Sequence, residues 1–150
     1  LDEVIAESLR HISRKHDEYT IVTKCEELIL VRMDVQLIIQ VLVNLIDNAI
    51  KYTPKGSKIC IRGMKCNGKA QICVEDNGPG IADEMKPYIF EMFYTGKSTI
   101  ADSQRSLGLG LSLCQSIIEA HDGRLILTDN TPRGCIFTFT LPLSEVTLNE

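Results

Sequence analysis

The segment from Asp34 to Tyr52 constrains the fold more than any other part of the sequence. Its pattern predicts a long helix that is apolar around most of its circumference. Asp34 is a favoured N-cap residue, and the Thr-Pro-Lys-Gly stretch at 53–56 ends the helix. A helix with so broad an apolar face has to pack against other elements. Its apolar residues are Leu37, Ile38, Val41, Leu42, Leu45, Ile46 and Ala49.

A sheet is predicted to supply the surface for that packing. Segments 58–65 and 69–76 have strand patterns, and Asn67-Gly68 between them is a strong hairpin signal. The other elements follow from hydrophobic periodicity: strands at 19–23, 28–31, 124–128 and 134–141, and helices at 2–15, 84–91 and 108–121. In the last strand one face carries Cys135, Phe137, Phe139 and Leu141. The pattern is α+β, a mixed sheet covered on one face by about three helices.

Charge and composition exclude several classes of function. A net charge of −4 and a pI near 5.4 disfavour nonspecific nucleic-acid binding, which needs clustered Lys and Arg. The six cysteines contain no CxxC pair, which favours free thiols in a reducing cytosol over a zinc site or disulfides. No apolar run approaches the ~18–20 residues of a membrane span, so no membrane contact is expected. The chain begins at Leu1, so we expect a piece of a larger parent.

A narrow polar stripe runs along the predicted helix at 34–52. It comprises Gln36, Gln40, Asn44, Asp47, Asn48 and Lys51. One interpretation is an ordinary solvent-exposed face. The other is a ligand site, because two asparagines one turn apart are poor helix formers. Their oxygens can complete a Mg²⁺ shell beside water and phosphate, and Lys51 can hold phosphates. The residues alone leave both interpretations open.

The segment 75–81, Glu-Asp-Asn-Gly-Pro-Gly-Ile, follows a predicted strand. Asp76 is in phase with Ile72 and Val74, so its carboxylate falls on the buried face, where it needs hydrogen-bond donors. The exocyclic amine of a purine would be such a donor. Gly78 and Gly80 let the backbone turn sharply and approach a ligand closely. The alternative is an ordinary Asn-Gly turn with a solvated Asp76.

Glycines also open the predicted helix at 108–121, in the run Gly108-Leu109-Gly110-Leu111. Exposed helix N–H groups behind glycines bind anions, because the positive end of the helix dipole faces the ligand. The preceding segment 94–107 has little to bury, and Lys97 or Arg105 could supply a cation in a lid over a phosphate chain. A surface loop with no role in ligand binding explains the same composition.

Taken together and in this order, four motifs resemble those of the GHKL superfamily of ATP-binding domains, and specifically its sensor histidine kinases. Residues 44–52 look like the N box, 76–80 like the G1 box, 90–93, with Phe90 and Phe93, like the F box, and 108–111 like the G2 box. The resemblance covers about 1–142 as one catalytic ATP-binding domain and leaves 143–150 as a polar tail. The stretches at 121–123 and 130–134 look most like potassium-responsive Kdp-type sensor kinases.

The resemblance implies a two-layer α/β sandwich, the Bergerat fold, with Mg²⁺ and ATP as cofactors. Asn48, assisted by Asn44, would coordinate Mg²⁺, and Lys51 would contact phosphate. Tyr52 would pack on the adenine, and Asp76 would accept its amino group. The other residues expected to line the ATP site are Gly78, Gly80, Ile81, Lys97, Gly108, Leu109, Gly110 and Leu111. One departure from the family pattern concerns the lid and its phosphate contacts: Ser106-Leu107 stands where many relatives begin the G2 box with an extra glycine.

The superfamily also contains ATPases, which usually carry a glutamate base four residues before the N-box asparagine. Asn44 occupies that position here and has no useful basicity, which favours transfer of the γ-phosphate to a protein. A noncatalytic nucleotide-binding interaction module is the remaining alternative. His11, His16 and His121 lack the surroundings of the family's acceptor histidine, and His121 is interpreted as a helix-end residue.

The expected partner is therefore a histidine-bearing dimerisation domain of the same parent, which relays phosphate to a response regulator. The resemblance implies that the isolated domain is monomeric and that the parent is homodimeric. It also implies that this is a cytoplasmic domain whose parent is bound to the bacterial inner membrane.

Overall fold

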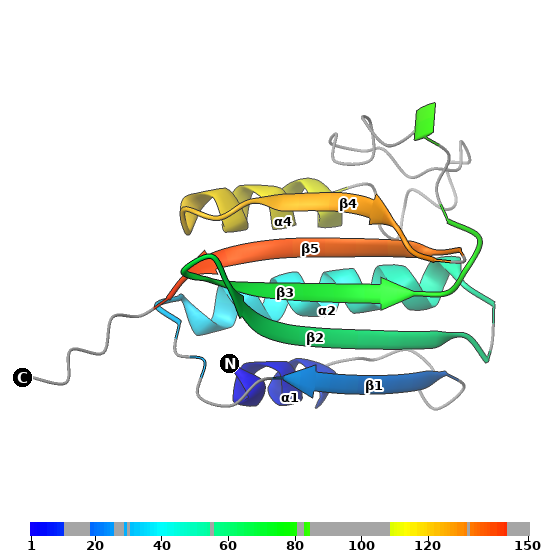
Figure 1. Ribbon diagram of the computed structural model, residues 1–150, viewed down its shortest axis with the longest axis horizontal. Coiled ribbons are helices and arrows are strands. Elements are labelled where there is room, and N and C mark those ends of the chain that lie inside the picture. Colours follow the sequence, from blue (N-terminus) through cyan, green and yellow to red (C-terminus); the bar gives the residue numbers. More distant parts are fainter. Residues whose placement is uncertain are drawn as a thin grey trace, which may run out of the picture.

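A computed structural model gives the arrangement of the chain (Figure 1). The description covers residues 1–10, 19–25, 29, 31–54, 56–80, 83–84, 109–131 and 133–143. Of these, five are described by their backbone alone: Asp2, Lys51, Tyr52, Leu109 and Gly110. Most of the predicted helix at 84–91 lies outside the described residues, as do 11–15 of the first predicted helix.

Five strands form one mixed sheet in the order β1-β2-β3-β5-β4. The first strand, β1, pairs in parallel with β2, and all other pairs are antiparallel. The strands are β1 (Thr20–Cys25), β2 (Lys58–Cys66), β3 (Lys69–Asp76), β4 (Leu125–Asp129) and β5 (Cys135–Pro142). The predicted mixed sheet is confirmed, and β3 lies at its centre.

The hairpin between β2 and β3 has the predicted two-residue turn. Asn67 has φ of 53° and Gly68 has φ of 78°, and the flanking residues Cys66 and Lys69 pair across the turn. Positive φ at both central positions is the requirement of a type I′ turn, whose twist matches that of the strands. This turn sets the register that opposes Ile59 to Asp76 at the far end of the hairpin.

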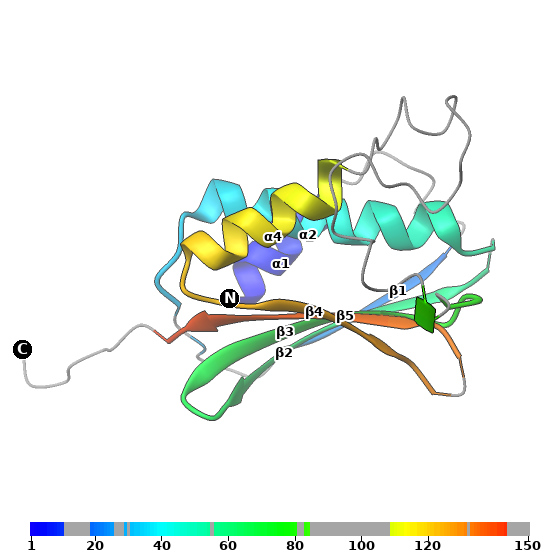
Figure 2. The same cartoon turned by 90° about the horizontal axis from the view of Figure 1, so that it is seen from above.

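Three described helices, α1 (Asp2–Arg10), α2 (Val35–Tyr52) and α4 (Leu109–Ala120), cover one face of the sheet (Figure 2). Asp34 caps α2 as predicted, since its Oδ1 accepts a hydrogen bond from the Leu37 N–H at 3.3 Å. No helix among those described is both long enough and apolar enough to cross a membrane.

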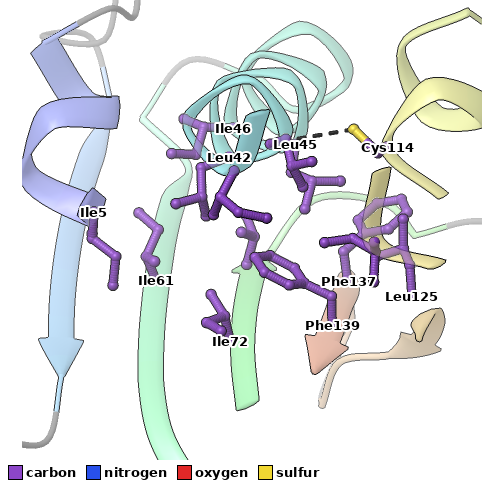
Figure 3. Close-up of a cluster of buried hydrophobic side chains, with 14 of the residues drawn as sticks. Ile5, Leu42, Leu45, Ile46, Ile61, Ile72, Cys114, Leu125, Phe137 and Phe139 are labelled. Atoms are coloured by element: carbon purple, nitrogen blue, oxygen red, sulfur yellow. Dashed lines mark hydrogen bonds between the residues drawn. The ribbon is translucent and has the colours of Figure 1, made fainter. Parts of the chain in front are cut away.

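The core lies between α2 and the sheet (Figure 3). Leu42, Leu45 and Ile46 of α2 are completely buried, as are Ile61 and Ile72 of the sheet. Burial of each such side chain contributes about 1.5–3 kcal/mol relative to exposure. The predicted alternation of β5 is confirmed, because its buried residues are Cys135, Phe137, Phe139 and Leu141.

One predicted strand is described only in part. In the segment 28–31, Leu28 and Leu30 lie outside the described residues, and Val31 forms an isolated antiparallel bridge with Leu143. Leu143, which the sequence assigns to the polar tail, is half-buried against the core. An apolar side chain next to the end of β5 is held by core contact, and residues 144–150 lie outside the description.

Candidate functional site

The C-terminal end of α2 meets the loop that follows β3. Thr53 ends α2, and a Cβ added to Gly78 would lie 2.4 Å from the Thr53 Cγ2 atom. Only glycine allows so close an approach of the two segments. The fold therefore brings together the end of the polar stripe and Asp76, which are separated in the sequence by the whole β2–β3 hairpin.

The same end of α2 is held by side chains that satisfy its last carbonyl groups. The Tyr19 hydroxyl lies within hydrogen-bond distance of the Ile50 and Thr53 carbonyl oxygens, at 3.0 and 3.1 Å. The Thr53 hydroxyl donates to the Ala49 carbonyl at 2.7 Å. Such contacts supply partners for carbonyls that a helix end leaves unpaired. The positions of Asn44 and Asn48 are thus anchored from the end of their helix.

Asp76 is buried on the core face, as its phase with Ile72 and Val74 predicts; 7% of its surface is exposed. One carboxylate oxygen, Oδ1, accepts from the main-chain N–H of Gly78 at 2.9 Å and from that of Cys135 at 3.3 Å. Within the described part of the chain, no residue donates to Oδ2. The protein thus occupies one oxygen and leaves the other to accept a hydrogen bond from a ligand.

Burial raises the pKa of Asp76 above its ordinary value of 3.8, and the N–H groups of Gly78 and Cys135 partly offset that rise. Removing the carboxylate from water disfavours its charged form, whereas hydrogen bonds to the charged form favour it. A ligand that donates to Oδ2 would stabilise the ionised state further. The site is therefore suited to a neutral or cationic donor.

The connection between β4 and β5 contributes residues that sequence reasoning missed as site residues. The Asn130 side-chain Nδ2 donates to the Asp76 carbonyl at 2.8 Å, and the Asn130 N–H donates to the Gly134 carbonyl at 3.0 Å. Gly134 has φ of 115°. The signal in the residues themselves was an asparagine four residues before a glycine, between two strands. It predicts a turn, but it does not predict which strand end the turn contacts.

Asn44 and Asn48 are half-buried on α2, and Asn44 also contacts α4. Cys114 of α4 donates through Sγ to the Val41 carbonyl at 3.8 Å (Figure 3). Burial raises the pKa of the Cys114 thiol to about 12, and a hydrogen bond from the Asn44 side chain opposes this rise.

His121 lies just beyond the end of α4 and connects it to the start of α2. Its Nε2 accepts from the Asp34 N–H at 3.0 Å, and its Nδ1 lies 2.8 Å from the Ile117 carbonyl. These contacts require the tautomer with hydrogen on Nδ1. The interpretation of His121 as a helix-end residue is confirmed. His11 and His16 lie outside the described residues.

Other predicted site residues are placed only in part. Leu111 is half-buried and packs against the core, and Leu109 and Gly110 lie in the first turn of α4. Lys51 and Tyr52 lie in the last turn of α2. The predicted residues outside the description are Ile81, Phe90, Phe93, Lys97, Arg105 and Gly108.

The candidates for holding a metal ion in the described part of this site are Asn44 and Asn48. No group of three or more His, Cys, Asp or Glu side chains in the described ranges is placed to hold a metal. The nearby donors Asn44 and Asn48 are neutral amides. Mg²⁺ accepts amide oxygens but usually keeps several waters and shares its shell with substrate phosphates. The donor set fits an ion that arrives with a phosphate chain.

Comparison with known proteins places this geometry in a family. Residues 33–145 match the family described as "Histidine kinase-, DNA gyrase B-, and HSP90-like ATPase". The chain is 40% identical over 143 residues to the Sensor protein KdpD of Clostridium acetobutylicum, covering 95% of this chain and 16% of KdpD. It is 43% identical over 119 residues to the Adaptive-response sensory kinase SasA of Nostoc sp., covering 79% of this chain and 29% of SasA.

Solved structures agree with these sequence relatives. The catalytic domain of histidine kinase ThkA superposes with a TM-score of 0.82 at 34% identity, covering 95% of this chain and 91% of that chain. ThkA in complex with the response regulator protein TrrA superposes with a TM-score of 0.78 at 32% identity, covering 96% of this chain and 40% of that chain. The predicted sandwich fold and the resemblance to sensor histidine kinases are confirmed.

Proposed function

Since the chain belongs to the family of histidine kinase-, DNA gyrase B- and HSP90-like ATPases, we propose that it binds Mg·ATP and phosphorylates a histidine. Its fold is that of a histidine kinase catalytic domain, and its relatives include sensor kinases. The acceptor histidine lies on a separate dimerisation domain of the parent protein. From that domain the phosphate passes to a response regulator.

The observation that carries this proposal is the hydrogen bonding of the Asp76 carboxylate. Its Oδ1 is held by two main-chain N–H groups, so its orientation is set before any ligand binds. Its Oδ2 then serves as a directed acceptor for the exocyclic amine of adenine. A charge-assisted hydrogen bond of this kind contributes roughly 1.5–3 kcal/mol. Guanine, which has a carbonyl oxygen at the corresponding position, would place an acceptor against this oxygen.

Asn48, assisted by Asn44, would hold the Mg²⁺ ion together with water and the phosphates. The ion supplies charge neutralisation and orientation of the triphosphate. Asn48 lies one turn beyond Asn44 on the same face of α2, and the end of that helix adjoins the loop after Asp76. The single helix α2 would thereby hold the Mg²⁺- and phosphate-binding residues next to the adenine site. Lys51 and the start of α4 would contact the phosphates.

The lack of basicity of the Asn44 side chain favours phosphoryl transfer over hydrolysis. A water molecule attacking the γ-phosphate needs a base, and the neutral amide of Asn44 cannot act as one. In the transfer, the bond between the γ-phosphorus and the β–γ bridging oxygen breaks, and a bond to an imidazole nitrogen forms. ADP leaves with the electron pair of the broken bond, and the imidazole releases its proton to solvent. The protein contributes positioning and charge stabilisation.

The partners follow from the relatives. The chain corresponds to a small part of KdpD and SasA, so sensing and dimerisation belong to other regions of the parent. ThkA has been captured with the response regulator TrrA, which supports a regulator as the final phosphate acceptor here. We expect a homodimeric parent attached to the bacterial inner membrane, with this domain monomeric in isolation and on the cytoplasmic side.

Substitution of Asp76 tests adenine recognition. In Asp76→Asn the amide oxygen can keep both main-chain hydrogen bonds, while the amide nitrogen presents a donor in place of the acceptor. ATP affinity should fall by about 10- to 150-fold in calorimetric titrations. Glu75→Gln is the matched control, because Glu75 faces the opposite side of the sheet and pairs with Arg62 at 2.8 Å. Equal ATP affinity in wild type and Asp76→Asn would refute the assignment.

Labelled ATP tests the reaction itself. The chain should transfer acid-labile, base-stable label to the dimerisation domain of its own parent and should not label itself. Hydrolysis in the absence of that partner should be slow, because Asn44, at the position of the ATPases' glutamate, cannot act as a general base. Rapid hydrolysis without the partner would instead support the ATPase alternative, and no binding of ATP would support a noncatalytic module.

A further inference from the structure

We propose that Asn130 is a positioning residue for adenine recognition, acting through Asp76 and the connection between β4 and β5. This inference rests on the proposed function, because it assigns a role in ATP selectivity to residues that do not themselves touch the base. Asn130 would set where the Asp76 carboxylate lies and which way its free oxygen points.

The first step concerns the main chain of Asp76. The pairing of β3 with β5 ends at Glu75, which lies opposite Ile136. The Asp76 carbonyl is therefore beyond that ladder, at the point where the backbone turns into the glycine loop. Asn130 Nδ2 donates to this carbonyl at 2.8 Å and replaces the donor that a longer ladder would have supplied. The last residue of β3 is held by a side chain that is 54 positions away.

The second step concerns the orientation of the Asn130 amide. While Nδ2 contacts the Asp76 carbonyl, Oδ1 accepts from the Thr131 N–H at 2.8 Å. A reversed amide would oppose two acceptors at one end and two donors at the other. The Asn130 N–H also donates to the Gly134 carbonyl at 3.0 Å and closes the connection. One asparagine thus satisfies both ends of its amide and fixes the backbone next to it.

The third step links the connection to the carboxylate. A Cβ on Gly134 would lie 2.0 Å from the Asp76 carbonyl oxygen, so the two backbones are in direct contact. This contact places the Cys135 N–H within 3.3 Å of Asp76 Oδ1. A shift of the connection away from Asp76 would lengthen that bond and allow the carboxylate to rotate. The free oxygen, Oδ2, would then lose its fixed direction toward the ligand.

A positioning role and a purely structural role differ in what they do to selectivity. If Asn130 only stabilises the fold, its loss should weaken all nucleotides equally. If it positions Asp76, its loss should weaken ATP but not purine riboside triphosphate, which lacks the exocyclic amine that Asp76 would bind. The measurement is therefore the ratio of the two dissociation constants, determined by calorimetry on the same protein preparations.

We expect Asn130→Ala to weaken ATP about two- to tenfold, the effect of one neutral hydrogen bond, and to leave the analogue unchanged. Asn130→Asp, which is isosteric and keeps the Thr131 contact, opposes an acceptor to the Asp76 carbonyl and should weaken ATP further. Thr131→Ala is the control, because Thr131 is exposed and contributes its main-chain N–H. Unfolding midpoints verify that each variant is folded.

A double-mutant cycle completes the test. In the Asp76→Asn background, Asn130→Ala should cause no further loss of ATP affinity, because the two residues act through one hydrogen bond to the base. Equal losses for ATP and the analogue, additive losses in the cycle, or unchanged ATP binding in Asn130→Asp would each overturn the role of Asn130. Wild type that does not distinguish ATP from the analogue would instead refute adenine recognition by Asp76, and the inference with it.

Discussion

Two regions hold the site together, and they are built from different parts of the chain. The Asp76 corner, which comprises Asp76, Gly78, Asn130, Gly134 and Cys135, depends mainly on main-chain donors and on close backbone approach. The α2–α4 contact depends mainly on side chains. It comprises Asp34, Val41, Asn44, Cys114 and His121.

The difference bears on how each region tolerates substitution. Main-chain N–H groups survive any replacement except proline, so the donors to Asp76 persist when the side chains around them change. The corner is instead vulnerable where a new Cβ would separate the backbones. The α2–α4 contact has the opposite character, because each of its hydrogen bonds can be removed singly while both helices stay packed through apolar residues. The proposed adenine recognition thus rests on the less replaceable region.

The largest effect is expected at Gly134. In Gly134→Ala the new methyl group would lie 2.0 Å from the Asp76 carbonyl oxygen, 2.8 Å from its carbon and 2.9 Å from the Asn77 Cα. All three atoms are backbone and cannot rotate away, so the connection must move. We expect the free energy of unfolding to fall by about 3 kcal/mol or more, measured by urea denaturation.

Gly68→Ala separates crowding from backbone strain. Gly68 also has positive φ, 78°, but a Cβ there meets nothing within 4 Å. The cost should be about 1–2 kcal/mol, that of a left-handed alanine. Equal costs at the two glycines would show that the backbone contact at the Asp76 corner has no special importance.

A change of pH should affect ligand binding and stability in opposite directions at the Asp76 corner. Because burial raises the pKa of Asp76 above 3.8, the native state binds more protons than the unfolded state between 3.8 and the raised value. As pH falls through this window, the contribution of Asp76 to stability should therefore rise relative to Asp76→Asn. Selectivity for ATP over purine riboside triphosphate should fall over the same window, toward the level of Asp76→Asn, because the protonated carboxyl loses its charged acceptor.

Denaturation and calorimetry at matched pH values measure both quantities. Both nucleotides carry the same triphosphate, so the ratio of their dissociation constants cancels the titration of that group. A selectivity that stays constant down to pH 4 while Asp76→Asn remains defective would contradict the role of the ionised carboxylate.

The smallest effect is expected from the α2–α4 contact. Cys114→Ala removes a buried sulfur and its bond to Val41 but leaves the apolar packing of both helices, and should lower the free energy of unfolding by about 1–2 kcal/mol. Cys66→Ala is the control, because Cys66 is exposed and its replacement should change stability by less than about 0.5 kcal/mol. A loss at Cys114 as large as that at Gly134 would remove the distinction between the two regions.

Much of the fold could be predicted because it depends on local patterns. The hairpin at Asn67-Gly68 follows from two residues that tolerate positive φ, and the ends of α2 follow from Asp34 and the Thr-Pro-Lys-Gly stretch. The burial of Asp76 follows from alternation along a single strand. Each of these predictions relates residues that are close in the sequence, where backbone geometry alone decides which side chains share a face.

The sequence by itself thus determined the three described helices, the five strands of the sheet, and a carboxylate on a buried face. Only the tertiary structure decided which oxygen of Asp76 is occupied, that Asn130 holds the Asp76 carbonyl, and that His121 contacts Asp34 from 87 positions away. The physical reason is that periodicity within one element specifies the face on which a side chain lies, but not the residue of another element that it contacts. Neighbours are chosen when the sheet order β3-β5-β4 and the packing of α4 on α2 bring distant segments within hydrogen-bond distance.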